Sequence, residues 1–372
     1  MKIKITRNNL LNALNISSNA LCSKTSLPIL ECFLIEAKNN KITITANNTE
    51  ITIINSTEAE VIENGSVAIN GRFLIEMIKG LPEKDITLSV NDSFLCKLSC
   101  EKEKKEEIKT EFQCKDSKEF PKTLSYSKEN MIEITEYQLK KAIERTLITV
   151  AKENEERKEL TGVYLNVKND QLKMKSLDGF KLGIINQTLR QKQTKELTTI
   201  IPRQTLENIS KIIKGDLNKD IKIYINEKNI VFETVNATLI SNIIQKQFPP
   251  TSQIEKNEYK IKVIVNRISL LNSINLTKMF SSLDEKPVIL DIKENKLNVK
   301  INSLIGSMEE NININKTGED ISIAFYHKHL LPILNNIEDE EIKLYLNTSD
   351  YPIVIKDDNE NYYYLILPVT IK

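Results

Sequence analysis

The sequence predicts an α+β protein built from three similar units in tandem. Short segments in which apolar and polar residues alternate greatly outnumber helical segments. One strand–helix pattern also recurs along the chain, with equivalent leucines 129 and 131 residues apart. The length of 372 residues agrees, since it suits two or three domains of roughly 150 residues each. We expect antiparallel sheets with the helices gathered on one side of them.

The first helix of each unit follows a short alternating strand. Thr or Asn stands at the expected N-cap, where a side-chain oxygen can accept a free backbone N–H. An apolar residue comes four positions later, and these residues are Leu10, Leu139 and Leu270. Further apolar and small residues at helical spacing complete one buried face. The predicted helical windows are 7–15, 136–152 and 266–278.

A second helix is predicted inside each unit, over 70–80, 202–215 and 326–336. Its apolar residues follow the i, i+3, i+4 spacing of an amphipathic helix in the first and third units. Pro202 suits a first helical turn, and Gly80 and Gly215 suit helix ends. Pro332 breaks the pattern, and we expect it to kink or shorten the third of these helices.

Most of the remaining chain reads as strand. Period-two alternation predicts strands at 3–5, 41–45, 50–54, 132–134, 221–225, 261–265, 297–301 and 341–346. Two Phe-Pro pairs, Phe120-Pro121 and Phe248-Pro249, lie 128 residues apart and close the first two units. We therefore place three domains at 1–126, 127–253 and 254–372.

The distribution of charge along the chain indicates nucleic acid as a partner. The total of 52 Lys and Arg against 51 Asp and Glu gives a net charge of +1, which excludes only a uniformly basic protein. The six helical windows hold thirteen basic and four acidic residues, a net of +9, and leave −8 elsewhere. A basic helical side suits sequence-independent binding of a polyanion. The alternative is that solvated helix faces simply favour Lys and Arg.

The sequence offers no sign of an enzyme. No phosphate-binding glycine loop, nucleophile elbow or zinc-protease motif occurs, and the two histidines leave little material for a metal site. No cofactor is expected. The run Glu338–Glu341 reads as a solvated loop whose carboxylates are matched to no basic partner, and residues 101–107 read as a solvated hairpin tip.

The cysteines and the amino terminus indicate the cytoplasm. Neither an apolar signal segment nor a membrane-length apolar run is found. The cysteines are odd in number, contain no C-x-x-C pair, and read as buried or incidental thiols: Cys22, Cys32, Cys96, Cys100 and Cys114.

Five short segments, in order, resemble those of the bacterial DNA sliding clamps, the β subunits of DNA polymerase III holoenzyme. They are Thr25–Leu30, Ser176–Leu182, Ile201–Arg203, Gln247–Pro249 and Leu367–Val369. The resemblance covers essentially the whole chain. It implies three clamp domains per subunit and a head-to-tail homodimer that closes into a ring, with antiparallel sheets outside and paired helices inside. Such a ring encircles double-stranded DNA without reading its sequence and catalyses nothing.

The resemblance also implies a partner pocket between the second and third domains. In this family the pocket accepts short peptides with apolar ends from the replicative polymerase, the clamp loader and repair proteins. Phe180-Lys181 departs from the usual His-Arg, which implies a shifted partner preference. The implied pocket residues are Leu160, Leu177, Gly179, Phe180, Lys181, Leu182, Pro249, Ile254, Pro352, Leu365, Leu367, Pro368 and Val369.

The resemblance and the charge pattern together suggest contacts with DNA and with a second copy of the chain. The DNA candidates are Lys24, Arg72, Lys141, Arg145, Asn154, Arg157 and Arg203. At the dimer seam we expect Phe112 and the 70–80 helix on one side, and Met279 and Phe280 on the other. Two alternatives stay open: a non-ring, three-domain DNA-binding scaffold protein, and an enzyme with an unrecognised site.

Overall fold

The computed structural model describes residues 1–22, 25–101, 106–123, 125–153, 155–255, 258–281 and 286–370. It divides into two compact units. Unit 1 comprises Met1–Glu136 and Glu207–Ile243, and unit 2 comprises Tyr137–Leu206 and Ile244–Lys372. The middle repeat is therefore shared between the two units.

Unit 1 contains two antiparallel sheets. The five-stranded sheet has the order β5 (Glu60–Glu63), β1 (Lys2–Thr6), β7 (Asp85–Val90), β8 (Leu95–Glu101) and β9 (Glu107–Gln113). The eight-stranded sheet has the order β10 (Met131–Thr135), β13 (Asp220–Ile225), β14 (Asn229–Glu233), β15 (Ala237–Asn242), β4 (Ile51–Glu58), β3 (Lys41–Asn47), β2 (Cys32–Lys38) and β6 (Gly65–Asn70).

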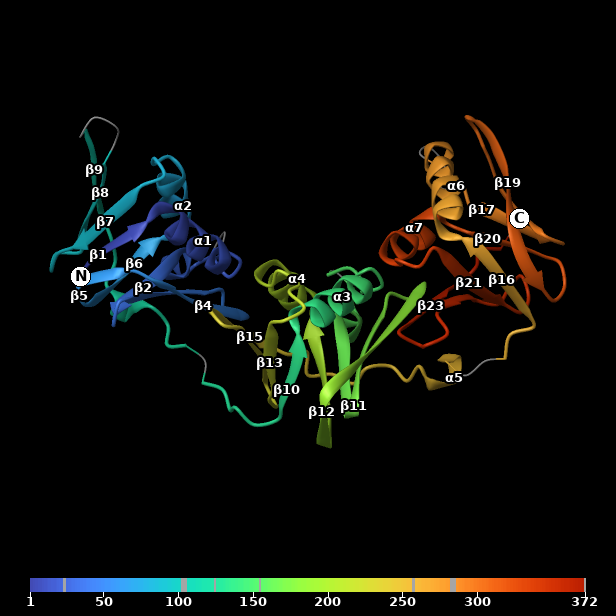
Figure 1. The fold of residues 1–372 in the computed structure, drawn as a ribbon, viewed down its shortest axis with the longest axis horizontal. Helices are drawn as coiled ribbons and strands as arrows, with labels where there is room; N and C mark the ends of the chain where they lie inside the picture. Colours follow the sequence, from blue (N-terminus) through green and yellow to red (C-terminus); the bar gives the residue numbers. More distant parts are fainter. Residues whose placement is uncertain are drawn as a thin grey trace. The chain divides into compact units, whose positions relative to one another are not determined.

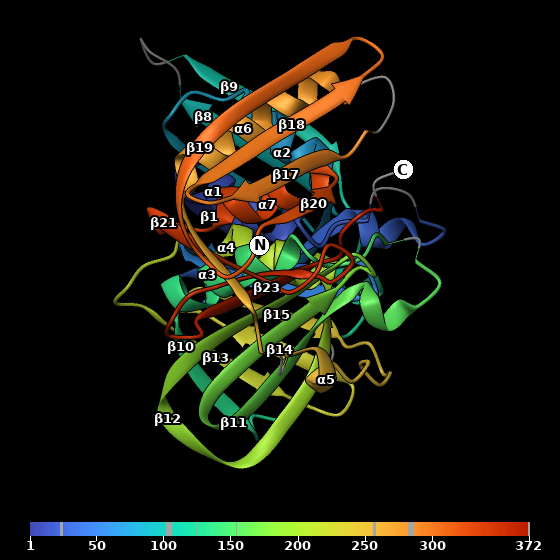
Figure 2. The same ribbon diagram turned by 90° about the vertical axis from the view of Figure 1, so that its right-hand side faces the viewer.

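Unit 2 is built on one ten-stranded antiparallel sheet, and Figure 2 shows its long β11–β12 hairpin. The order is β11 (Gly162–Leu177), β12 (Lys181–Pro202), β23 (Tyr362–Ile366), β22 (Ile353–Lys356), β21 (Glu341–Leu346), β16 (Ile261–Asn266), β19 (Gly306–Thr317), β18 (Lys296–Ser303), β17 (Val288–Lys293) and β20 (Ile321–Phe325).

Each unit contains a junction where a strand of one repeat pairs with a strand of the next. At the first junction β15 pairs with β4, with Ser241 opposite Ile51 (Figure 1). At the second junction β23 pairs with β12, with Ile366 opposite Lys181. The sheets thus run without a break from the first repeat into the second and from the second into the third.

All six predicted helices are present: α1 (Arg7–Ser18), α2 (Gly71–Lys79), α3 (Glu136–Leu147), α4 (Arg203–Ile212), α6 (Arg267–Phe280) and α7 (His327–Asn336). The expectation that α3 reaches residue 152 was wrong. Buried Thr146 donates to the carbonyls of Ala142 and Ile143, and Thr149 to that of Thr146, so side chains replace the helical pattern there. A short helix, α5 (Ser252–Glu255), was not expected.

Pro332 lies inside α7 and does not shorten it. A proline removes one backbone N–H from the helix, at a cost that neighbouring contacts must offset. Leu330, Ile333 and Leu334 are buried around it, and the Pro332 carbonyl accepts the side-chain amide of Asn336. Packing against α6 and β23 therefore holds the helix through the proline.

The first helices of the three repeats share one buried face. Leu10, Leu139 and Leu270 are each at most 2% exposed, which confirms the predicted equivalence. One turn later stand three small or hydroxyl residues, Ala13, Ala142 and Ser273, all buried. The predicted N-caps of α1 and α6 are also confirmed, since Thr6 accepts the Asn9 N–H and Asn266 accepts the Ser269 N–H.

A further contact recurs in all three repeats. The first residue of the first helix, which is Arg7, Glu136 or Arg267, donates its backbone N–H to the loop after the second helix, at Lys84, Lys219 or Glu340. Its side chain also forms hydrogen bonds to backbone groups at or just after the end of the second helix. We call this set of contacts the helix tie.

The helix tie uses opposite charges in different repeats. The Arg7 guanidinium donates to the carbonyls of Ile78 and Lys79, at 3.1 and 2.8 Å. Arg267 does the same at Leu334 and Asp339, at 3.1 and 3.0 Å. In the middle repeat the carboxylate of Glu136 instead accepts the N–H groups of Lys214 and Asp216. The two arginines thus bond carbonyls at or just after the end of the second helix, whereas Glu136 bonds N–H groups just after it.

Four of the cysteines are buried, Cys22 is partly exposed, and all five carry free thiols. Among the residues that the structure covers, no helix combines the length and the apolar character needed to cross a bilayer.

Candidate functional site

The predicted partner pocket surrounds the tight turn between β11 and β12. Asp178 organises this turn: its Oδ1 accepts the N–H groups of Phe180 and Lys181, at 2.9 and 2.7 Å. Gly179 adopts φ +88°, a left-handed conformation that glycine enters without strain. The turn leaves the Phe180 ring 57% exposed.

Lys181 turns inward and does not present its charge to a partner. Its ammonium group donates to Asp178 Oδ2 at 2.5 Å and lies 3.5 Å from Nδ1 of His329. The residue is only 7% exposed. The Phe180 ring stacks on the His329 ring with centroids 5.2 Å apart. Of the two residues that depart from the family pattern, Phe180 therefore forms a flat aromatic surface with His329, and Lys181 is buried with its charge paired to Asp178.

The carboxyl-terminal segment lies against this turn. The Leu367 N–H donates to the Phe180 carbonyl at 2.9 Å, and the Val369 N–H donates to the Ala324 carbonyl at 2.8 Å. Leu367 keeps 40% of its surface exposed. Beneath it, Leu182 and Leu365 belong to one apolar cluster, against which Leu177 and Ile254 pack. The structure thus joins residues from three distant parts of the predicted pocket.

The remaining pocket candidates have no such shared contact among the described residues. Leu160 is buried in a 3-10 turn, Lys158–Leu160. Pro249 follows Phe248, whose ring stacks on Tyr164. Pro352 precedes β22, and Pro368 is partly buried between Leu367 and Val369.

A polar network lies next to the apolar cluster of the predicted pocket. Lys175 contacts Glu255 and Thr251, Thr251 donates to Glu255 at 2.5 Å, and Tyr363 donates to the Ile254 carbonyl at 3.0 Å. Burial alone would raise the pKa of Glu255. The hydrogen bonds from Lys175 and Thr251 outweigh this effect and hold the pKa below its usual value.

The predicted DNA contacts occupy different environments. Arg72 is exposed at the start of α2, Arg203 begins α4 and is partly buried, and exposed Arg157 pairs with Glu159 at 3.2 Å. Lys24 and Asn154 lie outside the described residues.

Lys141 and Arg145 are both paired with Glu338. Lys141 contacts one carboxylate oxygen, and Arg145 lies 3.7 Å from the other. The hydrogen bond from Lys141 lowers the pKa of Glu338, and the same bond raises the pKa of Lys141. The expectation that the 338–341 run lacks basic partners was therefore wrong. The pairing spans 197 residues of sequence, so local pattern did not reveal it.

Two of the thirteen basic residues in the predicted helical windows are not available to a polyanion. The Arg7 and Arg267 guanidinium groups are occupied with backbone carbonyls in the helix ties. The six long helices carry eleven basic residues, these two included, against four acidic ones, so an excess of positive charge remains without them.

The predicted dimer residues lie at apolar surfaces near sheet edges. Phe112 lies on β9, an edge strand, and packs edge-on against Phe73 of α2 with centroids 5.1 Å apart. Phe73 is 47% exposed. In unit 2, Met279 near the end of α6 is 61% exposed, and Phe280 ends the same helix.

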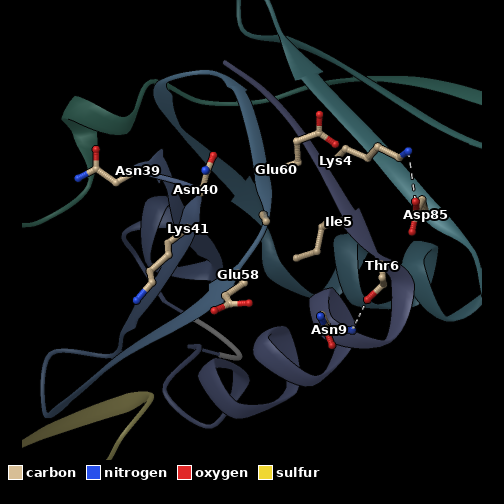
Figure 3. Close-up of a pocket in the computed structure, with 11 residues that line it drawn as sticks. Lys4, Ile5, Thr6, Asn9, Asn39, Asn40, Lys41, Glu58, Glu60 and Asp85 are labelled. Atoms are coloured by element: carbon tan, nitrogen blue, oxygen red, sulfur yellow. Dashed lines mark hydrogen bonds and ion pairs between the residues drawn. The ribbon is translucent and has the colours of Figure 1, made fainter.

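The described part of unit 1 contains several polar cavities that the sequence did not indicate, and two of them border α1. One, of about 560 Å³, lies between the start of α1 and the β2–β3 turn (Figure 3). Its Lys4 is paired with Asp85 at 3.3 Å, and its lining also holds Lys41, Glu58 and Glu60. The other, of about 490 Å³, is lined by α1 and by three lysines, Lys211, Lys214 and Lys219. No three His, Cys, Asp or Glu side chains converge as metal ligands in the part of the chain that is described.

A tandem repeat with basic helices on continuous antiparallel sheets is the architecture of the DNA clamps. The chain matches the family described as DNA polymerase III beta subunit in three consecutive segments: the N-terminal domain over residues 1–123, the central domain over 133–250 and the C-terminal domain over 254–370. The chain belongs to this family.

Relatives agree over their full lengths. The chain is 27% identical to the beta sliding clamp of Staphylococcus epidermidis, with 99% of each chain covered. A solved structure of a putative DNA polymerase III beta subunit from Eubacterium rectale is 33% identical with a TM-score of 0.94, and the sliding clamp of Bacillus subtilis is 25% identical with a TM-score of 0.94. Both structures are covered completely.

Membership identifies the chain as a DNA sliding clamp subunit. It acts with DNA and a DNA polymerase as a processivity subunit and is not itself a catalyst. This agrees with the basic helices and confirms the resemblance.

Proposed function

We propose that two copies of the chain close head to tail into a ring around duplex DNA. Each copy contributes three domains, with boundaries at 126 and 253. The observation that carries the proposal is a pair of open sheet edges, one in each unit. In unit 1, β9 pairs only with β8 among the described strands. An unpaired edge offers N–H and C=O groups to another strand.

The second open edge is the first half of β19. Its residues 306–313 pair with β18, whereas only 314–317 reach β16 on the other side. Apolar side chains flank both edges: Phe73 and Phe112 in unit 1, and Ile268, Leu276 and Met279 on α6 in unit 2. Figure 2 shows α6 beneath β18 and β19. Pairing β9 of one copy with β19 of the next would give the unpaired N–H and C=O groups of both strands hydrogen-bond partners. It would also cover the apolar side chains beside them.

Within the ring, exposed cations of the helices contact the DNA backbone, and the topology makes tight contact unnecessary. We propose Lys24, Arg72, Asn154, Arg157 and Arg203 as DNA contacts, with Lys141 and Arg145 as contacts reduced by Glu338. Linking a polymerase to an encircling ring keeps it at high local concentration near its template.

The partner site is the surface around Phe180 and Leu367. An apolar cluster, an exposed aromatic ring and a neutralised lysine favour peptides that end in apolar or aromatic residues. The replicative polymerase, the clamp loader and repair proteins would dock here in the cytoplasm.

Retention on circular DNA tests the ring. The protein is loaded on a nicked circle by a bacterial clamp loader with ATP, separated from free protein, and then the circle is cut. We expect retention on the closed circle and release within seconds of cutting. A non-ring scaffold would be held equally by both forms, and that result would overturn the proposal.

Sedimentation tests the dimer independently. We expect a species of twice 42.7 kDa at micromolar concentration. Phe112→Asp should shift it to the monomer, because a charge at the open edge opposes burial. Lys38→Asp, on strand β2 of the other sheet of unit 1, is a control for an exposed charge change away from this edge and should leave the dimer intact. A stable wild-type monomer would contradict the ring.

A further inference from the structure

Equivalent positions of the repeat carry differently charged side chains in the two units. In unit 1 a groove lies between the first helix of the first repeat and the loop after the second helix of the next. In unit 2 the equivalent helix and loop, α3 and the loop after α7, are joined by ion pairs. Alignment by the helix tie and by the buried leucines makes Lys141 and Arg145 of α3 equivalent to Asn12 and Ile16 of α1. By the same alignment, Glu338 is equivalent to Leu217.

In unit 1 this groove is open and positively charged. It encloses about 490 Å³, and its cations are Lys211 and Lys214 at the end of α4 and Lys219 in the following loop. All three are exposed. Only Lys219 has an ion-pair partner among the described residues, Asp216 at 3.6 Å. The opposite wall carries the exposed amides of Asn9, Asn12 and Asn15 on α1.

The one carboxylate in the lining does not cancel this charge locally. Glu136 is 8% exposed, and its Oε2 accepts the backbone N–H groups of Lys214 and Asp216. It is therefore engaged in the helix tie. The Asn208 side chain donates to the Asn19 carbonyl at 3.1 Å and fixes α4 against the end of α1. The groove walls are thus held in place without filling the space between them.

In unit 2 the cations at the equivalent place are paired with a carboxylate. Glu338 stands where Leu217 stands in unit 1, and it contacts both Lys141 and Arg145. Arg145 is held further by Tyr362, whose ring centre lies 5.7 Å from the guanidinium carbon. The helix cations and the loop anion therefore satisfy each other.

We propose that the lysine groove of unit 1 binds backbone phosphates of the encircled DNA, and that Glu338 withdraws the equivalently placed Lys141 and Arg145 of unit 2 from that role. This rests on the proposed function. DNA would then be held mainly by the first junction of each subunit.

The chemistry of the groove favours phosphodiester oxygens over an acidic peptide. Lysine ammonium groups and asparagine amides are both donors, and both commonly contact DNA phosphates. Peptide sites are lined largely by apolar side chains, whereas the described lining here is mostly polar, with Val235 exposed at its rim. Phosphates repeat along the duplex, so a shallow, open groove can take them in any register.

Salt-dependent binding to short linear duplex tests the proposal. The first variant is Lys211→Gln/Lys214→Gln/Lys219→Gln, and the matched control is Lys192→Gln/Lys195→Gln/Lys228→Gln, which removes three exposed lysines outside the groove. Fluorescence anisotropy gives the dissociation constant at several NaCl concentrations. We expect the groove variant to bind at least tenfold more weakly at low salt. Its slope of log K against log salt should fall by about one per lost phosphate contact.

The second variant is Glu338→Gln, which frees Lys141 and Arg145. We expect it to bind duplex several-fold more tightly, with a steeper salt dependence. Equal weakening in the groove variant and its control would overturn the phosphate site, and unchanged affinity in Glu338→Gln would overturn the neutralisation. Weakening by an added acidic peptide would favour the peptide alternative. Wild-type failure on circular DNA would instead count against the ring itself.

Discussion

The two inter-repeat junctions have turns with the same backbone hydrogen bonds, but the side chains on their surfaces differ in polarity. At the second junction Asp178 accepts two N–H groups of its turn, and the Leu367 N–H reaches the Phe180 carbonyl. At the first junction Asn48 accepts the Glu50 and Ile51 N–H groups, and the Asn242 N–H reaches the Glu50 carbonyl. The turns are therefore built by the same hydrogen bonds.

The side chains at these equivalent places differ. Leu177, Phe180 and Leu367 correspond to Asn47, Glu50 and Asn242. The second junction exposes the apolar side chains of Phe180 and Leu367, which a peptide can cover. The first instead presents the exposed carboxylate of Glu50, which water solvates well, while Asn47 is buried and Asn242 partly exposed. The two junctions thus have similar backbone turns, and only their side chains favour the second one as the proposed partner site.

The largest expected effect is loss of partner binding from charge at the second junction. Leu367→Asp with Val369→Asp should weaken binding of a labelled polymerase-derived peptide at least 100-fold, about 3 kcal/mol, because two carboxylates would be desolvated against the apolar cluster. Fluorescence polarisation measures the affinity. Asn242→Asp, the equivalent change at the first junction, should have no effect. Unchanged affinity in the double variant would remove the pocket assignment, provided that sedimentation shows an intact dimer.

The next largest expected effect is a loss of stability when the left-handed backbone of Gly179 has to accommodate a side chain. Gly179 has φ +88° and open space where a Cβ would lie, so a substitution there adds only conformational strain. Gly179→Thr should lower the free energy of unfolding by about 1–2 kcal/mol. A shift of the urea midpoint measures it, and a neutral result would mean that the turn relaxes.

The reverse change should stabilise the first junction. Thr49 stands at the place of Gly179 and adopts φ +76°, which a β-branched residue rarely does. Thr49→Gly should raise the free energy of unfolding, by about 0.5–1 kcal/mol once the greater entropy of unfolded glycine is subtracted. Opposite signs at equivalent positions would confirm that one backbone geometry serves both turns, and equal signs would contradict it.

The smallest expected effect is a pH dependence of the free energy of unfolding, which the second junction should show and the first should not. Glu255 and Lys175 at the second junction correspond to Ser127 and Thr45 at the first. Because the folded pKa of Glu255 is lowered, its stabilising contribution is present above the ordinary glutamate pKa of about 4.3 and is lost as pH falls through the folded value. The stability difference between wild type and Glu255→Gln should therefore shrink from pH 6 to pH 3. A constant difference would exclude a contribution from ionisation.

Local patterns predicted much of the fold. Caps and apolar spacing located all six long helices, because both signals lie within a few residues of each other. The end of α3 was missed because Thr146 and Thr149 bond their own backbone there. The short helix α5 offered too few residues for a periodic signal.

The site was harder to predict from residues alone. Glu338 is exposed as expected, but the side chain of Arg145 is only 14% exposed. The pairing of Lys141 and Arg145 with Glu338 joins α3 to a loop nearly two hundred residues away. The resemblance supplied the pocket positions. It could not supply the inward turn of Lys181, which depends on Asp178 and on His329 from the third repeat.

The helix tie has a consequence for how the chain folds. Three homologous repeats synthesised on one chain can exchange helices during folding, because each offers a similar apolar face. Arg7 and Arg267 seek carbonyls at the end of a partner helix, whereas Glu136 seeks N–H groups. A helix docked in the neighbouring repeat would therefore lose the side-chain hydrogen bonds that it makes in its own repeat. We expect this loss to disfavour the exchange of helices between adjacent repeats.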